Sequence, residues 1–68
     1  MLASGTHITV FDSAKNELGE GTLIRSQFHP DMGLTVYECK EHLILAKGIH
    51  WLKIGNELNK IDPKEGKK

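Results

Sequence analysis

Hydrophobic and polar positions alternate in short runs along most of this chain. Between His7 and Ile54, runs of apolar and β-branched residues are separated by residues that favour turns. This pattern is typical of a small antiparallel β-domain. The run at 7–11 predicts a strand in which alternate side chains share a face, and the turn formers at 12–16 predict a reversal into residues 17–18. We therefore expect a first hairpin here.

A long, bent second strand is expected next. Gly19 and Gly21 flank Glu20 just before an apolar and β-branched run at 22–28. Glycines inside a strand usually mark a bulge or a sharp bend, of the kind that curls a sheet. A Gly-x-Gly without a third glycine and a following helix is a weak phosphate-loop signal, so a bend explains it better.

Three further runs of β character follow this strand. A proline-containing turn at 29–33 predicts a second hairpin into residues 34–38, which alternate again. The runs 43–46 and 49–54 are separated only by two residues, Lys47 and Gly48, a spacing that fits a tight hairpin turn. Residues 40–47 are also compatible with a short helix, but so short a helix is costly to nucleate. We therefore expect strands in this region, which gives the domain five strands.

The two ends of the chain differ in character from this central region. Leu58 and Ile61 stand three residues apart, which predicts a short helical turn across an open barrel end, with a last short strand as the alternative. Residues 62–68 are charged and carry no large apolar side chain, so we expect a disordered tail. Residues 1–5 are expected to be flexible. Residues 6–61 then form one small β-domain.

The predicted fold class is all-β, a five-stranded antiparallel meander curled into an SH3-like, partly open barrel, since closure limits exposed edges. A flat meander that hides its edge and apolar face against a second subunit explains the same sequence. Alternation assigns one set of apolar residues to the core: Ile8, Val10, Ile24, Leu34, Val36, Leu43, Leu45, Leu52 and Ile54. A second set falls on the opposite face: Phe11, Leu23, Phe28, Tyr37, Ile44, Ile49 and Trp51.

The length of 68 residues makes this core marginal. A chain of about this size buries only about 60% of the surface that its unfolded form exposes, and small domains commonly add disulfides, a metal or a partner subunit. Cys39 is the only cysteine, so no disulfide can form within the chain, and a lone thiol fits a reducing cytoplasm. No stretch approaches the roughly 20 apolar residues of a membrane span. We expect a cytoplasmic protein that forms a homo-oligomer.

Charge argues against a general nucleic-acid binder, although it leaves that function open. Nine Lys and Arg residues balance nine Asp and Glu residues, so the chain lacks the basic field that usually marks such proteins. Small β-barrels nevertheless bind single strands by stacking bases on aromatic side chains beside cations. The available aromatic residues are Phe28, Tyr37 and Trp51, and the available cations are Arg25, Lys40, Lys47 and Lys53.

Metal binding and catalysis find little support in the sequence. Cys39 and His42 have a ligand-like C-x₂-H spacing, with His50 and His29 as further candidates. Positions i and i+3 of a strand point to opposite faces, however, so this pair shares a metal only across a turn. A nucleophilic pair also needs an orienting group and an oxyanion pocket, for which so small a domain has little room. We expect no cofactor and no enzymatic activity.

The function that the sequence favours is a non-catalytic protein-binding or assembly module, such as a regulator or inhibitor of a partner protein. It would act through an apolar and aromatic surface. Trp51 and Tyr37 are the first candidate anchors, because aromatic side chains with one polar atom are enriched at interface centres. Phe28 and Ile49 are further candidates. The alternative for Trp51 is a place in the centre of the core.

Overall fold

The chain folds into one antiparallel β-sheet that curls over itself. The computed structural model describes residues 5–63, and within them it contains no helix. There are six strands: β1 (His7–Phe11), β2 (Glu17–His29), β3 (Leu34–Cys39), β4 (Leu43–Lys47), β5 (His50–Ile54) and β6 (Glu57–Ile61). Their order in the sheet is β4-β3-β2-β1-β5-β6, and the sheet does not close into a barrel. The all-β prediction is confirmed, but with six strands instead of five.

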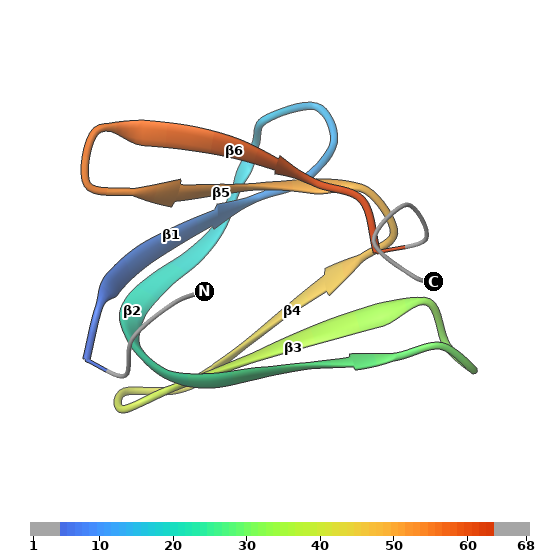
Figure 1. The fold of residues 1–68 in the computed structure, drawn as a ribbon, viewed down its shortest axis with the longest axis horizontal. Coiled ribbons are helices and arrows are strands. Elements are labelled where there is room, and N and C mark those ends of the chain that lie inside the picture. Colours follow the sequence, from blue (N-terminus) through green and yellow to red (C-terminus); the bar gives the residue numbers. More distant parts are fainter. Residues whose placement is uncertain (1–4, 64–68) are drawn as a thin grey trace.

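The long strand β2 holds the two halves of the sheet together. Its first half pairs with β1 and its second half with β3, so β1, β5 and β6 form one layer and β3 and β4 the other (Figure 1). The predicted bend lies where β2 passes between them. A Cβ atom on Gly21 would lie 2.9 Å from the Cβ of Cys39, which is too close. Glycine is therefore required where the two layers approach each other.

The predicted hairpin between β4 and β5 is wrong. The two strands do follow each other after a short connection, in which Gly48 has a φ of 63°. However, β5 pairs with β1 in the other layer, and β3 is the only strand in the described residues that pairs with β4. The tight turn at Gly48 therefore leads the chain from one layer to the other. There β5 pairs with the edge of β1 that β2 leaves free. The sheet is therefore not a simple meander.

The predicted C-terminal helical turn is also wrong. Residues 57–61 form β6, which pairs with β5 through a two-residue turn at Gly55 and Asn56. Gly55 has a φ of 61°, which suits the first central position of a tight hairpin turn. The N–H of Gly5 donates a hydrogen bond to the carbonyl of Leu23, with 2.7 Å between N and O. Most of the predicted flexible and disordered termini, residues 1–4 and 64–68, lies outside the described residues.

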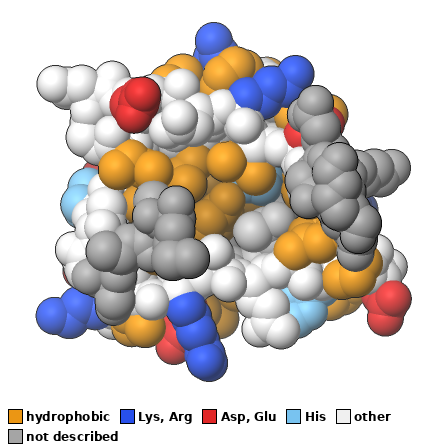
Figure 2. Space-filling model, in the orientation of Figure 1, with side chains coloured by type: hydrophobic (Ala, Val, Ile, Leu, Met, Phe, Trp, Pro, Cys, Tyr) orange, Lys and Arg blue, Asp and Glu red, His pale blue; other side chains and the backbone are white. Residues whose placement is uncertain are grey.

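The hydrophobic core lies between the two layers. It consists of Ile8, Val10, Leu23, Tyr37, Cys39, Ile44, Ala46 and Leu52, with Ile54 and Ile61 packed against it. Figure 2 shows hydrophobic side chains in the middle of one face, where the curled sheet stays open. No helix that could span a membrane occurs in residues 5–63.

The predicted assignment of faces is right for β1 and wrong for β3 and β4. Ile8 and Val10 are buried as expected. In β3 and β4, however, Tyr37 and Ile44 point into the core, whereas Leu45 is exposed. Both faces of these strands are apolar, so alternation alone does not choose between them. The assignment is also reversed at the register shift of β2, where Leu23 is buried and Ile24 is exposed.

A buried tyrosine–histidine pair lies inside this core. His50 is 0% exposed and Tyr37 is 3% exposed. Nδ1 of His50 lies 2.8 Å from the carbonyl oxygen of Gly48. Because a carbonyl oxygen can only accept, Nδ1 carries the proton and donates a hydrogen bond to this oxygen. Nε2 is therefore the acceptor for the hydroxyl of Tyr37, with 2.6 Å between O and N. Both polar side chains are thus satisfied within the core.

Candidate interaction surface

The second layer of the sheet carries apolar side chains on its outer side as well as on its core side. We call this surface the outer β3–β4 face; it comprises Leu34 and Val36 of β3 and Leu43 and Leu45 of β4. Leu43 is 61% exposed and Leu45 is 53% exposed. Val36 lies directly opposite Leu45 in the register of β3 and β4. Leu43 lies opposite Glu38 and Leu34 lies opposite Lys47, so the apolar side chains form the centre of a surface with a charged side chain towards either end.

The sequence contains a signal for this surface that alternation misses. Residues 43–46 are four consecutive apolar residues, and strands buried on both faces have such continuous runs. β4 nevertheless lies at the edge of the sheet, with only its inner face covered by the core. A strand with the composition of a central strand therefore occupies an edge position.

Within residues 5–63, the free edge of β4 also presents backbone groups that no other strand pairs with. The N–H of Cys39 donates to the carbonyl of His42 at 2.9 Å, and the N–H of Gly48 donates to the carbonyl of Gly33 at 2.8 Å. In the alternating antiparallel pattern, these bonds place Ile44 and Ala46 in hydrogen-bonded pairs with β3. Leu43, Leu45 and Lys47 consequently direct their backbone N–H and C=O groups away from the sheet.

Charge on the outer β3–β4 face is sparse and largely compensated. Nε of Arg25 lies 2.7 Å from Oε1 of Glu38, on neighbouring strands. Such solvent-exposed pairs contribute little to stability. Lys47 ends β4 and is exposed. The apolar side chains are therefore bordered by charge without being covered by it.

Trp51 lies on the outer side of the other layer and not in the core. It stands directly opposite Phe11 on β1 and opposite Lys60 on β6. The Nζ atom of Lys15 lies 4.5 Å from the centre of its ring. Lys53, two residues further along β5, is exposed on the same side. Trp51 is thus half-buried in a cluster of one further aromatic side chain and three lysines.

The other predicted anchors have different surroundings. Tyr37 is buried, so its prediction as a surface anchor is wrong: its strand turns the opposite face outward. Phe28 and Ile49 line a shallow pocket of about 330 Å³ at one end of the sheet, together with Gly33, Gly48, Asp62 and Pro63. The structure therefore brings two of the four predicted anchors together, away from Trp51.

The predicted cations do not form one patch. Arg25 is paired with Glu38, Lys40 lies in the turn between β3 and β4, Lys47 ends β4, and Lys53 is on β5. They lie on different elements and in both layers. The lysines near the ring of Trp51 are Lys15, Lys53 and Lys60. Of these, the sequence predicted only Lys53 as a candidate cation.

The predicted metal ligands are held apart. The thiol of Cys39 is in the core, where burial raises its pKa. Nε2 of His42 donates to the backbone carbonyl of Glu20 at 2.8 Å, and both ring nitrogens of His50 are already bonded. No group of three potential metal ligands occurs in the part of the chain that the structure describes.

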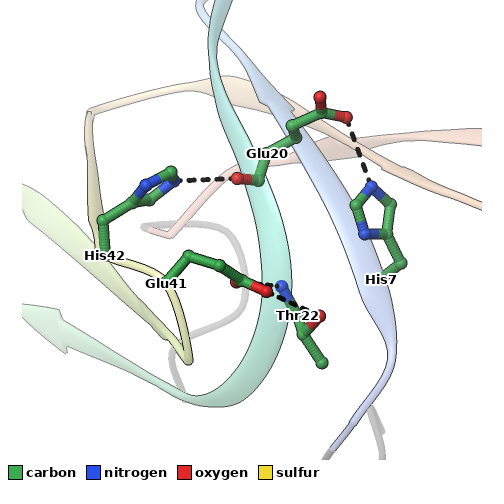
Figure 3. A network of polar contacts seen from close by, with 5 residues as sticks. All are labelled: His7, Glu20, Thr22, Glu41 and His42. Carbon is green, nitrogen blue, oxygen red and sulfur yellow. Dashed lines mark hydrogen bonds and ion pairs between the residues drawn. The ribbon is translucent and has the colours of Figure 1, made fainter.

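Polar contacts fasten the turn between β3 and β4 to the bend of β2 (Figure 3). The carboxylate of Glu41 accepts hydrogen bonds from the backbone N–H of Thr22, at 2.9 Å, and from its hydroxyl, at 3.2 Å. The backbone hydrogen bond lowers the pKa of Glu41 below its ordinary value. On the other side of β2, Nε2 of His7 lies 3.2 Å from Oε1 of Glu20. These contacts connect the turn before β4 to the part of β2 that pairs with β1.

Comparison of the chain with models of protein families, with curated proteins and with solved structures finds no match.

Proposed function

We propose that this protein is a non-catalytic protein-binding or assembly module that acts through the outer β3–β4 face. The observation that supports this most directly is the exposure of Leu43 and Leu45, at 61% and 53%, on an edge strand. Contiguous exposed apolar patches on small proteins commonly mark interaction sites. Burying a leucine side chain completely contributes about 1.5–3 kcal/mol, so a partner that covers these residues gains favourable binding free energy.

The marginal size of the domain points in the same direction. Among residues 5–63, no further strand or helix covers the outer side of the second layer of the sheet. Small domains often gain the missing burial from another subunit. A regulator or inhibitor that docks this face on its target, in a reducing cytoplasm, fits both features. We also propose that the architecture is a variant of the SH3-like partly open barrel, because β2 is shared by both layers and β5 returns to β1.

Site-specific photo-crosslinking in cells tests this function. A photoreactive amino acid at position 45 is expected to give a discrete crosslinked product, whose second component is identified by mass spectrometry. The same amino acid at Ser13, an exposed turn position outside the proposed surface, is the matched control. Products that require position 45 and disappear with Leu43→Lys support the proposal. Crosslinking that is equal at both positions, or absent at 45, contradicts it.

A second candidate function, single-stranded nucleic-acid binding, is favoured by the surroundings of Trp51. Phe11 and Trp51 form a cross-strand aromatic pair, and Lys15, Lys53 and Lys60 lie beside it. Bases stack on exposed aromatic side chains, and lysines neutralise phosphates. Two observations weigh against it: Lys15 already covers the ring of Trp51, and the chain has no net positive charge.

Fluorescence of Trp51, the only tryptophan, tests this candidate by titration with an oligothymidylate. Binding through the lysines predicts quenching whose affinity falls steeply with added salt, because phosphate contacts release counterions. Trp51→Leu should weaken binding measured by oligonucleotide anisotropy. An anisotropy that does not change at low salt rules this function out.

A further inference from the structure

We infer that the partner covering the β4 edge is a second copy of this chain, joined by antiparallel pairing of β4 with β4 in a two-fold symmetric dimer. This inference rests on the proposed function, because it names the occupant of the same surface. The pairing would make one continuous sheet of β2-β3-β4 from one copy and β4-β3-β2 from the other.

The unpaired backbone groups of β4 restrict how two copies can pair. Leu43, Leu45 and Lys47 face the free edge with their N–H and C=O groups, so hydrogen-bonded pairs must join odd-numbered residues. With a two-fold axis at Ile44, Leu43 of each copy lies opposite Leu45 of the other. With the axis at Leu45, Leu43 would instead lie opposite Lys47. The first register is favoured because it matches apolar residues with apolar residues.

The position of Lys47 favours the same register. The axis at Leu45 would place Lys47 of each copy opposite Leu43 of the other. The axis at Ile44 leaves Lys47 beyond the paired leucines, beside the turn in which the carboxylate of Glu41 is bonded to Thr22.

The two-fold axis also places the apolar side chains on one side. An axis perpendicular to the sheet turns the outer faces of both copies in the same direction, so Leu43 and Leu45 from each copy become cross-strand neighbours. β4 lacks the features that usually protect an edge, since it has no proline, no bulge against β3 and no charge before Lys47. A second copy supplies a strand of matching length and polarity.

The interface is expected to be of modest strength. Pairing of two five-residue strands belongs at the low end of interface sizes, below about 1,200 Å². The dimer should therefore dissociate on dilution. Light scattering over a dilution series is expected to show a mass that falls from two chains to one, and Leu45→Lys should remain monomeric at concentrations at which the natural chain is dimeric.

Disulfide trapping tests the register directly. In the register around Ile44, the Cα atoms of positions 43 and 45 in the two copies are about 5.5 Å apart, within reach of a disulfide. Identical positions are diagonal neighbours, about 7–8 Å apart or more, and so mostly beyond reach. Leu43→Cys and Leu45→Cys, mixed in a glutathione redox buffer, should form a mixed disulfide, whereas each variant alone should form little.

The controls separate the possible outcomes. The natural chain, whose Cys39 is buried, and Ser13→Cys mixed with Leu45→Cys give the background of random oxidation. A mixed 43–45 disulfide well above this background supports the inference. Preferential Leu45→Cys homodimers overturn the register, and a monomeric mass with no disulfide above background overturns the dimer. A photo-crosslink from position 45 to a different protein would then still support the proposed function while refuting a second copy as the occupant.

Discussion

Tyr37→Phe is the substitution that most directly tests the account of the core. It removes only the hydroxyl that donates to Nε2 of His50 across 2.6 Å and keeps the ring, which lies edge-on to the imidazole at 5.6 Å between centroids. Because His50 is 0% exposed, no water can replace the lost donor without rearrangement. Leaving a buried acceptor unpaired costs about 1–3 kcal/mol.

Urea denaturation followed by the fluorescence of Trp51 measures this cost. For a domain of 60–100 residues, each kcal/mol lowers Tm by about 4–8 °C, so thermal unfolding should shift by roughly 4–24 °C. His50→Leu should also destabilise the protein, since it leaves the hydroxyl of Tyr37 and the carbonyl of Gly48 without their partner.

The double variant Tyr37→Phe/His50→Leu distinguishes a hydrogen bond from simple packing. Replacing both partners by apolar groups removes the unpaired atom that each single variant leaves, so the double variant should cost less than the sum of the singles, by about 0.5–3 kcal/mol. A Tyr37→Phe cost below about 0.5 kcal/mol, together with additive single effects, would refute the reasoning.

Three further predictions concern the bend of β2 and ionisation. Gly21→Ala should destabilise the fold by about 1–3 kcal/mol, because its Cβ would lie 2.9 Å from the Cβ of Cys39; Gly19→Ala should cost less, since it meets only the side chain of Ile44 at 3.2 Å. Equal costs in urea denaturation would contradict this. Hydrogen bonds from Thr22 lower the pKa of Glu41, so the stabilisation by its carboxylate is present above the unfolded-state pKa and is lost as pH falls. The difference in unfolding free energy between the natural chain and Glu41→Gln should therefore shrink below about pH 4.5. A difference that is constant with pH would contradict this. Burial raises the pKa of Tyr37 to about 12, so absorbance at the phenolate band should titrate well above the ordinary value of 10, and stability should fall as pH rises between these values; ionisation near 10 in the folded state would contradict this.

Strand positions were largely predictable because they depend on local pattern. β1 lies where alternation placed it, and the Gly19 and Gly21 signals correctly predicted a long, bent β2. The helical turn predicted near Leu58 failed because spacing over so few residues fits both a turn and a strand, and pairing with β5 decided for the strand. The β4–β5 hairpin failed because a tight turn with Gly48 is equally compatible with a corner between layers.

The candidate surface was predictable only in part. The sequence marked Phe28 and Ile49, which share a pocket, and Trp51, which lies outside the core. It placed Leu45 in the core and Tyr37 at the surface, and the structure shows the reverse. The reason is that both faces of β3 and β4 carry apolar side chains, so alternation along the sequence does not show which face is buried.

The sequence by itself determined the class of the fold, the main strands and the bend at Gly21, since β propensity, alternation and glycine chemistry act over a few residues. Only the tertiary structure decided that β5 joins β1, that β4 stays at the edge, and that Tyr37 pairs with His50 inside the core. Those outcomes depend on which layers pack together, and on a register in which a one-residue shift exchanges the buried and exposed sides of a strand. The exposed leucines of β4, and hence the proposed interface, follow from that choice.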